Sequence, residues 1–149
     1  MAEWQLIKGI TELSDSKVWD TAKLEWTLAE IIFEAEPDTC VCGHFPILEV
    51  CVITNRINGN RARVGNVCVK KFLGLPSNKI FEAIARVAKD DTKALNVEAI
   101  EFAFERGWID EKSRDFYLNT WRKHAGLSTK QLQWRQRLNR LVVQNSRRR

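Results

Sequence analysis

The stretch Thr39–Leu75, TCVCGHFPILEVCVITNRINGNRARVGNVCVKKFLGL, contains every cysteine of the chain and decides the fold. Its four cysteines, Cys40, Cys42, Cys51 and Cys68, lie within 29 residues. We expect no signal peptide and a reducing compartment, in which clustered cysteines favour a metal site over disulfides. We therefore predict a structural zinc site in this stretch.

The residues between the cysteines predict a small module around that site. Cys40–Gly43 is typical of a tight metal-binding turn, because glycine adopts the positive φ that such a turn needs. Two strands, 48–54 and 61–64, flank the turn signal Asn58-Gly59-Asn60, and a short helix follows over 67–72. Cys68 falls near the start of that helix, where the dipole favours a thiolate. The order of turn, hairpin and helix is that of a treble-clef-like zinc module.

The ligand set has a first choice and two alternatives. Zinc takes four ligands in a tetrahedron, with thiolate sulfurs about 2.3 Å away, and the four cysteines would supply a closed site without catalytic function. His44 is a rival ligand that would replace Cys51. Without metal, Cys51 and Cys68 would be small core residues. A module this short usually requires a metal or a partner for stability.

The remaining sequence predicts an α+β protein with a helical C-terminal half. Residues 1–9 form either a strand or a helix, a cap at Ser14–Ser16 starts a helix over 17–24, and a strand runs from 25 to 36. Four helices follow over 78–89, 97–106, 110–123 and 129–143, with caps at Ser77, Asn96, Asp110 and Ser128. We expect an N-terminal α/β segment with the zinc module over 1–76, and a helical region over 77–149 that ends in a flexible basic tail, Ser146–Arg149.

Charge is distributed unevenly along the chain, which has a net charge of +5. Residues 1–38 contain three Lys against nine Asp and Glu, whereas 55–71 contain five basic residues and 120–149 nine, with no acid in either segment. The basic segments predict contact with an anionic partner, although a charge run can also be merely a solvated surface. The nucleic-acid contacts we predict are Arg56, Arg61, Arg63, Lys70, Lys71, Lys130, Arg135, Arg137 and Arg140.

Other residue types add little to this prediction. Asn58 and Asn60 at the hairpin tip would add hydrogen bonds to nucleic acid. The six tryptophans have apolar neighbours and are predicted to be core residues, without a stacking role. No phosphate-binding glycine loop, nucleophile elbow or paired-carboxylate motif is present, and no apolar run is long enough to cross a membrane. We expect a cytoplasmic protein that is not an enzyme.

The run CVCGHFPILEVCVITNRINGNRARVGNVCVKKFLG resembles a pattern found in small, mostly uncharacterised proteins of phages and bacterial mobile elements. The shared features are a Cys-x-Cys-Gly knuckle and a Val-Gly-Asn-x-Cys-Val-Lys-Lys-Phe block, and the segments AKLEW and LSTKQLQWRQRLNRL are similar as well. The resemblance implies zinc binding and a prokaryotic or phage-infected host cell. It carries no established activity.

Three functions are therefore predicted, in order of preference. The first is a zinc-stabilised protein that binds nucleic acid without catalysis. The second is a protein-binding modulator of a host enzyme, which would use the acidic N-terminal segment or the helices. The third is a nuclease-type enzyme.

Overall fold

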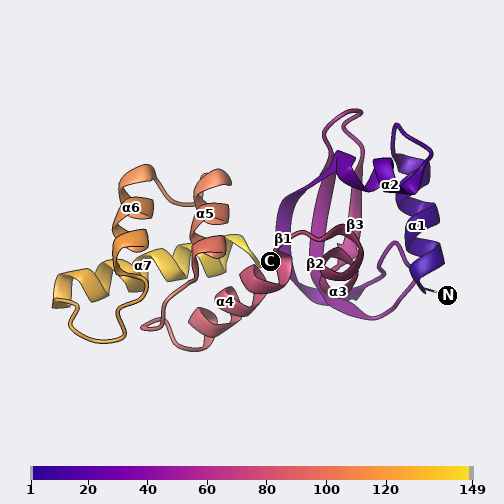
Figure 1. The fold of residues 1–149 in the computed structure, drawn as a ribbon. Helices are drawn as coiled ribbons and strands as arrows, with labels where there is room; N and C mark the ends of the chain where they lie inside the picture. The colour runs from indigo at the N-terminus through magenta and orange to yellow at the C-terminus, as the bar shows by residue number, and fades with distance from the viewer. Residues whose placement is uncertain (1, 148–149) are drawn as a thin grey trace. The chain divides into compact units, whose positions relative to one another are not determined.

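The computed structural model describes residues 2–147 and shows an α+β protein (Figure 1). The described chain divides into two compact units. The N-terminal unit comprises residues 2–78 together with Arg147, and the helical unit comprises Lys79–Ser146. No helix among the described residues is both long and apolar enough to cross a membrane.

A three-stranded antiparallel sheet forms the centre of the N-terminal unit. Its strands are β1 (Trp26–Asp38), β2 (Ile47–Asn55) and β3 (Arg61–Gly65), in the order β1-β2-β3. All three strands were predicted. The prediction ended the first strand before Pro37, but Pro37 lies inside β1, which is an edge strand and tolerates a residue without an N–H.

Helix α1 (Ala2–Leu13) begins the unit, so the helical alternative for the first residues is confirmed. Its residues Leu6 and Ile10 are fully buried, as expected for positions i and i+4 on the apolar face of an amphipathic helix. The helix predicted over 17–24 is shorter, since α2 spans only Trp19–Ala22 and a 3₁₀ turn, η1, follows over Lys23–Glu25.

Glu25 explains why the predicted cap at Ser14–Ser16 is wrong. Its side chain is only 2% exposed and accepts hydrogen bonds from the backbone N–H groups of Asp15 (2.8 Å) and Ser16 (2.9 Å). The Asn55 side-chain amide donates a third bond at 2.8 Å. These bonds hold the bent segment before α2 around the Glu25 carboxylate.

After β3 the chain turns directly into a short helix. Helix α3 spans Asn66–Cys68 and continues as a wider π turn, η2, over Val69–Leu73, where a single helix over 67–72 was predicted. Gly74 follows with a φ of 65°, a left-handed conformation that ends the helix.

The helical unit contains the four helices that the sequence predicted: α4 (Ser77–Lys89, whose first two residues belong to the other unit), α5 (Val97–Glu105), α6 (Glu111–Thr120) and α7 (Thr129–Asn145). Side chains of Asn96 and Asp110 cap α5 and α6, and Ser128 with Gln131 forms the predicted capping box of α7. Helix α6 ends at Thr120 rather than 123. Arg135 of α7 donates to the backbone carbonyls of Thr120 and Lys123, which satisfies this end of the helix.

Apolar side chains of α4, α5 and α7 are buried in the helical unit. They include Ile80, Phe81, Ile84, Ile100 and Leu138.

The prediction that the tryptophans are core residues holds for Trp26, which is 4% exposed, and fails for Trp4, which is 61% exposed. The other four are partly exposed.

The prediction of a flexible basic tail over 146–149 also fails at its start, because Ser146 is fully buried and Arg147 pairs with Phe33 of β1. Arg148 and Arg149 lie outside the described residues.

Candidate metal centre

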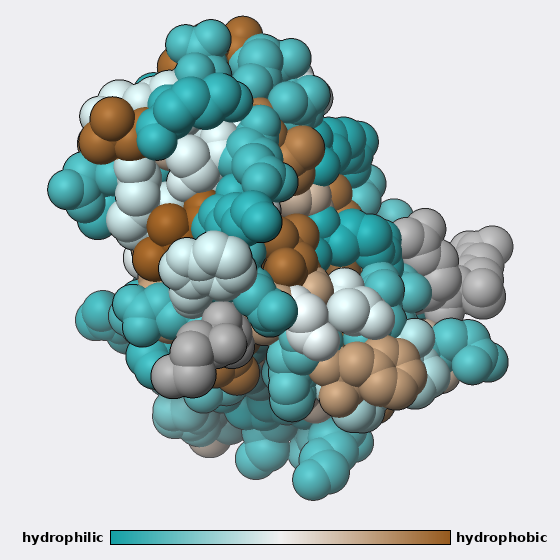
Figure 2. Space-filling model, turned by 90° about the vertical axis from the view of Figure 1, so that its right-hand side faces the viewer, coloured by the Kyte–Doolittle hydropathy of each residue, from teal (hydrophilic) through white to brown (hydrophobic). Residues whose placement is uncertain are grey.

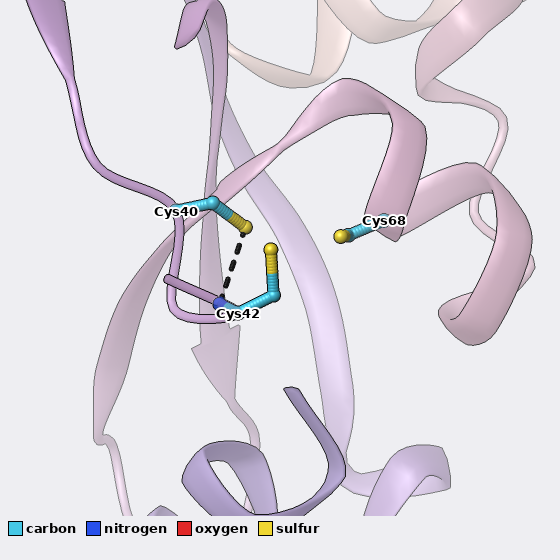
Figure 3. A group of neighbouring side chains, drawn as sticks. All are labelled: Cys40, Cys42 and Cys68. Carbon is cyan, nitrogen blue, oxygen red and sulfur yellow. Dashed lines mark hydrogen bonds between the residues drawn. The ribbon is translucent and has the colours of Figure 1, made fainter. Parts of the chain in front are cut away.

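Three of the four cysteines meet at one point of the N-terminal unit. Cys40 and Cys42 lie on the loop between β1 and β2, Cys68 lies in α3, and their side chains point toward one another (Figure 3). The three sulfurs lie within 4.8 Å of one another. Sulfurs bound to one tetrahedral zinc ion are about 3.8 Å apart, so a shift below about 1 Å would fit them to the ion. The group can therefore hold a metal.

Backbone N–H groups surround the first two sulfurs. The Cys40 Sγ accepts hydrogen bonds from the N–H of Cys42 (3.4 Å) and of Gly65 (3.2 Å), and the Cys42 Sγ accepts from the N–H of His44 (3.4 Å). Such bonds favour the charged thiolate, which is the form that binds metal. This loop, residues 40–44, is the knuckle of the site.

The knuckle is closed by its own backbone. The N–H of Gly43 donates to the Cys40 carbonyl (2.8 Å), and the N–H of Cys40 donates to the His44 carbonyl (3.0 Å). Gly43 has a φ of 89°, as the sequence predicted for this turn. These backbone bonds hold the first two thiols close to each other.

Helix α1 supports the knuckle from outside, which the sequence analysis did not predict. A methyl group on Gly9 would lie 2.6 Å from the Val41 side chain, and one on Gly43 would lie 2.8 Å from the Gln5 side chain. The close approach explains Gly9, whereas Gly43 is required mainly by its positive φ, because the Gln5 side chain can move away. The only signal in the sequence was a lone glycine in an amphipathic helix.

The two remaining candidate ligands, Cys51 and His44, lie outside this group of three. Cys51 is fully buried in β2, where it pairs with Ile31 and Val64. His44 is exposed on the knuckle. Within the described residues, the structure thus brings together three of the predicted ligands and leaves the fourth position open.

Protonation differs among the thiols. Burial raises the pKa of Cys40, and it raises that of Cys68 together with the neighbouring thiol of Cys40. Burial also acts against the Cys42 thiolate, but hydrogen bonds from the His44 N–H and the neighbouring thiols lower the pKa of Cys42 overall. Burial raises the pKa of Cys51 to about 12. Cys42 is therefore the member of the group that ionises most readily.

A cavity of about 560 Å³ adjoins the three cysteines, and all of them line it. Its other walls are largely apolar and include Pro46, Leu48 and Phe72, while His44 also faces it. Phe45, Leu48 and Val67 around it are more than half exposed. Figure 2 shows that apolar side chains gather in patches between hydrophilic ones on one face of the molecule. Ligand-binding cavities are commonly lined in this way.

The predicted basic contacts of the N-terminal unit fall into two groups. Arg61 pairs with Glu30 (3.3 Å), and Arg63 pairs with Glu34 (3.4 Å) and Asp38 (2.6 Å). Asn58 and Asn60 both donate to the Leu13 carbonyl, so the expected tip contacts are used within the fold. Among the predicted basic contacts of the N-terminal unit, Arg56, Lys70 and Lys71 are exposed and enter none of the ion pairs formed by described residues.

The basic residues of α7 also divide into two groups. Arg135 is buried, and Arg140 pairs with Asp91 at 2.8 Å. Lys130 and Arg137 are exposed and enter none of the ion pairs of the described helical unit. The sequence therefore predicted more exposed, unpaired basic side chains on α7 than the structure has. Sequence spacing does not reveal ion-pair partners from distant segments.

Comparison of the chain with protein-family models, curated proteins and solved structures yields no match.

Proposed function

We propose that the protein is a zinc-stabilised, non-catalytic nucleic-acid-binding protein of phage or mobile-element origin. The observation that carries the proposal is the convergence of the thiols of Cys40, Cys42 and Cys68 from a knuckle and a helix, beside exposed basic side chains. Zinc is the metal of choice because thiolate-rich tetrahedral sites select it. The module follows a treble-clef-like plan of knuckle, hairpin and helix.

The metal has a structural role in this proposal. The N–H groups at the sulfurs stabilise thiolates, and the ion would tie the β1–β2 loop to α3 across the sheet. The fourth ligand is His44 or Cys51. His44 lines the same cavity as the three cysteines, which supports it over Cys51, because Cys51 is fully buried in β2 and does not line that cavity.

The nucleic-acid contact would come from the side chains that the fold leaves free. Arg56 follows β2, and Lys70 and Lys71 lie in η2, directly after the cysteine of α3. Because phosphate contacts release bound counterions, affinity should fall steeply with salt.

The test is binding of fluorescent single-stranded and duplex oligonucleotides over a range of salt concentrations. Replacing Arg56, Lys70 and Lys71 together by alanine should weaken binding and lower the slope of log K against log salt by about 2. Arg61→Ala is the matched control, since its guanidinium is already paired with Glu30, and it should bind nearly as the wild type. Absence of binding at low salt, or a triple variant with the wild-type slope, contradicts the proposal.

The apolar cavity favours a second candidate, the protein-binding modulator. Its walls and the exposed Phe45, Leu48 and Val67 are suited to an apolar anchor of a partner protein. Purification with and without nuclease separates the two functions. A partner protein that remains after nuclease treatment and is lost on Leu48→Asp supports the second candidate over the first.

A further inference from the structure

Two neighbouring cavities in the helical unit are lined by basic residues. One is about 250 Å³ and the other about 170 Å³, and Lys93, Ala94 and His124 line both. Arg135 lines the larger, and Arg86 and Arg122 line the smaller. No aspartate or glutamate is among the described residues that line either cavity. This surface is therefore suited to an anion.

The buried guanidinium of Arg135 strengthens this interpretation. Arg135 is only 2% exposed, its Nη1 and Nη2 donate to two backbone carbonyls, and its Nε has no hydrogen-bond partner in the described structure. None of the ion pairs formed by described residues brings a carboxylate to it. A buried charge without a counter-charge is costly, and carbonyl dipoles compensate only part of it. An anion in the adjoining cavity would supply the rest.

The nearest acidic residues along the chain have partners of their own, although the Asp90 carboxylate also interacts electrostatically with Lys93. Asp90 accepts hydrogen bonds from the backbone and hydroxyl of Thr92, and Asp91 pairs with Arg140 and accepts from Gln136. Neither residue lines the cavities. Lys93 and His124 are exposed, so an anion could reach them from solvent.

An aromatic ring lies beside the basic groups. Trp121 lines the smaller cavity and is half-buried, with the Arg122 guanidinium 5.1 Å from its ring centroid. A tryptophan face next to cationic groups is the arrangement that holds a base beside its phosphate. Trp121 was predicted from the sequence to be a core residue without a stacking role.

We propose that these adjoining cavities bind one nucleotide unit, with its phosphate between Lys93, His124 and Arg135 and its base against Trp121. The choice of a nucleotide over another anion rests on the proposed nucleic-acid function. The site adds a second contact surface, in the unit that lacks the cysteines. Of the residues proposed to hold the nucleotide, only Arg135 belongs to α7.

The test is NMR of the full-length, zinc-loaded protein, observing the tryptophan indole N–H signals and assigning Trp121 with a Trp121→Phe variant. Adenosine 5′-monophosphate should shift the Trp121 signal, inorganic phosphate should compete with it, and adenosine should bind at least about tenfold more weakly. Lys93→Ala should weaken nucleotide binding about tenfold. Lys112→Ala, an exposed lysine of α6 that lines neither cavity, is the matched control and should leave affinity unchanged.

A Trp121 signal that does not respond to the nucleotide, or equal affinities of the Lys93 and Lys112 variants, overturns the inference. Oligonucleotide binding separates this result from the proposed function. If oligonucleotides bind the wild type but the nucleotide leaves the Trp121 signal unchanged, the inference fails and the function stands. If the nucleotide binds at Trp121 but oligonucleotides do not bind the protein, the inference stands and the function fails.

Discussion

The two units of the chain place their stabilising groups differently. In the N-terminal unit three thiols, from the loop before β2 and the helix after β3, lie close together. Backbone N–H groups donate to the Cys40 sulfur. In the helical unit the helices are joined by buried apolar side chains such as Phe81, Ile84 and Ile100, and side chains cap their ends. Under the proposed zinc binding, the stability of the N-terminal unit depends on the ion as well as on buried side chains such as Leu6 and Ile53, whereas that of the helical unit depends on packing and capping. Each unit should therefore respond to a different perturbation.

The largest expected effect is that of metal removal on the N-terminal unit. Zinc binding to a structural site contributes on the order of 10 kcal/mol, so a strong chelator should unfold much of this unit and leave the helical unit folded. Trp26 is buried in the first unit, and Trp108 and Trp134 pack against phenylalanines in the second. NMR should therefore show the Trp26 indole signal collapsing while the other two persist. An unchanged Trp26 signal after complete chelation would contradict the comparison.

The reciprocal change removes packing from the helical unit. Ile84 is 1% exposed in α4, and Ile84→Ala should lower the free energy of unfolding of this unit by about 2–5 kcal/mol, because it deletes buried methyl groups and leaves a cavity. Denaturant unfolding followed at Trp108 and Trp134 measures the change. Zinc content should stay at the wild-type level, and loss of the metal in this variant would show that the units are not independent.

A smaller effect is expected at the start of α7. Ser128→Ala removes the hydroxyl that accepts from the Gln131 N–H and should cost about 1 kcal/mol. Thr129→Ala, at the exposed first position of the same helix, provides the control. If both variants lose equal stability in denaturant titrations, the capping box is not the cause.

The smallest effect concerns Glu25 and appears as a dependence on pH. The Asn55 amide and the N–H groups of Ser16 and Asp15 hold the pKa of Glu25 below its ordinary value of 4.5, although burial opposes them. The carboxylate therefore stabilises the N-terminal unit at pH values above about 4.5, and this stabilisation is lost as pH falls through the lowered pKa. Glu25→Gln should melt below the wild type at neutral pH, with a difference that shrinks in acid.

Glu12→Gln is the control for this change, since Glu12 is an exposed residue of α1. A melting-point difference for Glu25→Gln that stays constant from pH 7 to pH 3 would exclude the ionised carboxylate as its source.

Local signals explain what the sequence could predict of this fold. Hairpin strands, the turn at Asn58–Asn60 and the caps Asn96, Asp110 and Ser128 all follow from residues within a few positions of the element concerned. The failures come from distant partners. The predicted cap at Ser14–Ser16 is wrong because the backbone N–H groups there donate to Glu25. Helix α6 ends earlier than predicted, where Arg135 binds the Thr120 carbonyl. Strand β1 continues through Pro37 because it is an edge strand.

The candidate site divides in the same way. The knuckle at Cys40–His44 could be predicted from its spacing and from Gly43, and Cys68 from its place at a helix start. That Cys51 lies outside the group of three depends on the register of β2 against β1 and β3, which places it opposite Ile31 and Val64. The ion pairs of Arg63 and Arg140 likewise join residues far apart in the chain.

The most direct test of the metal centre is the zinc content of the purified protein and of two variants, measured by mass spectrometry together with protein concentration. We predict about one zinc per chain in the wild type, loss of zinc in Cys68→Ser, and retention of zinc in Cys51→Ala. The two variants should differ because Cys68, unlike Cys51, belongs to the group of three sulfurs. A wild type without metal, or a Cys68→Ser variant that keeps its zinc and its melting temperature, would contradict the account. Loss of zinc in Cys51→Ala would assign the fourth ligand to Cys51 instead of His44.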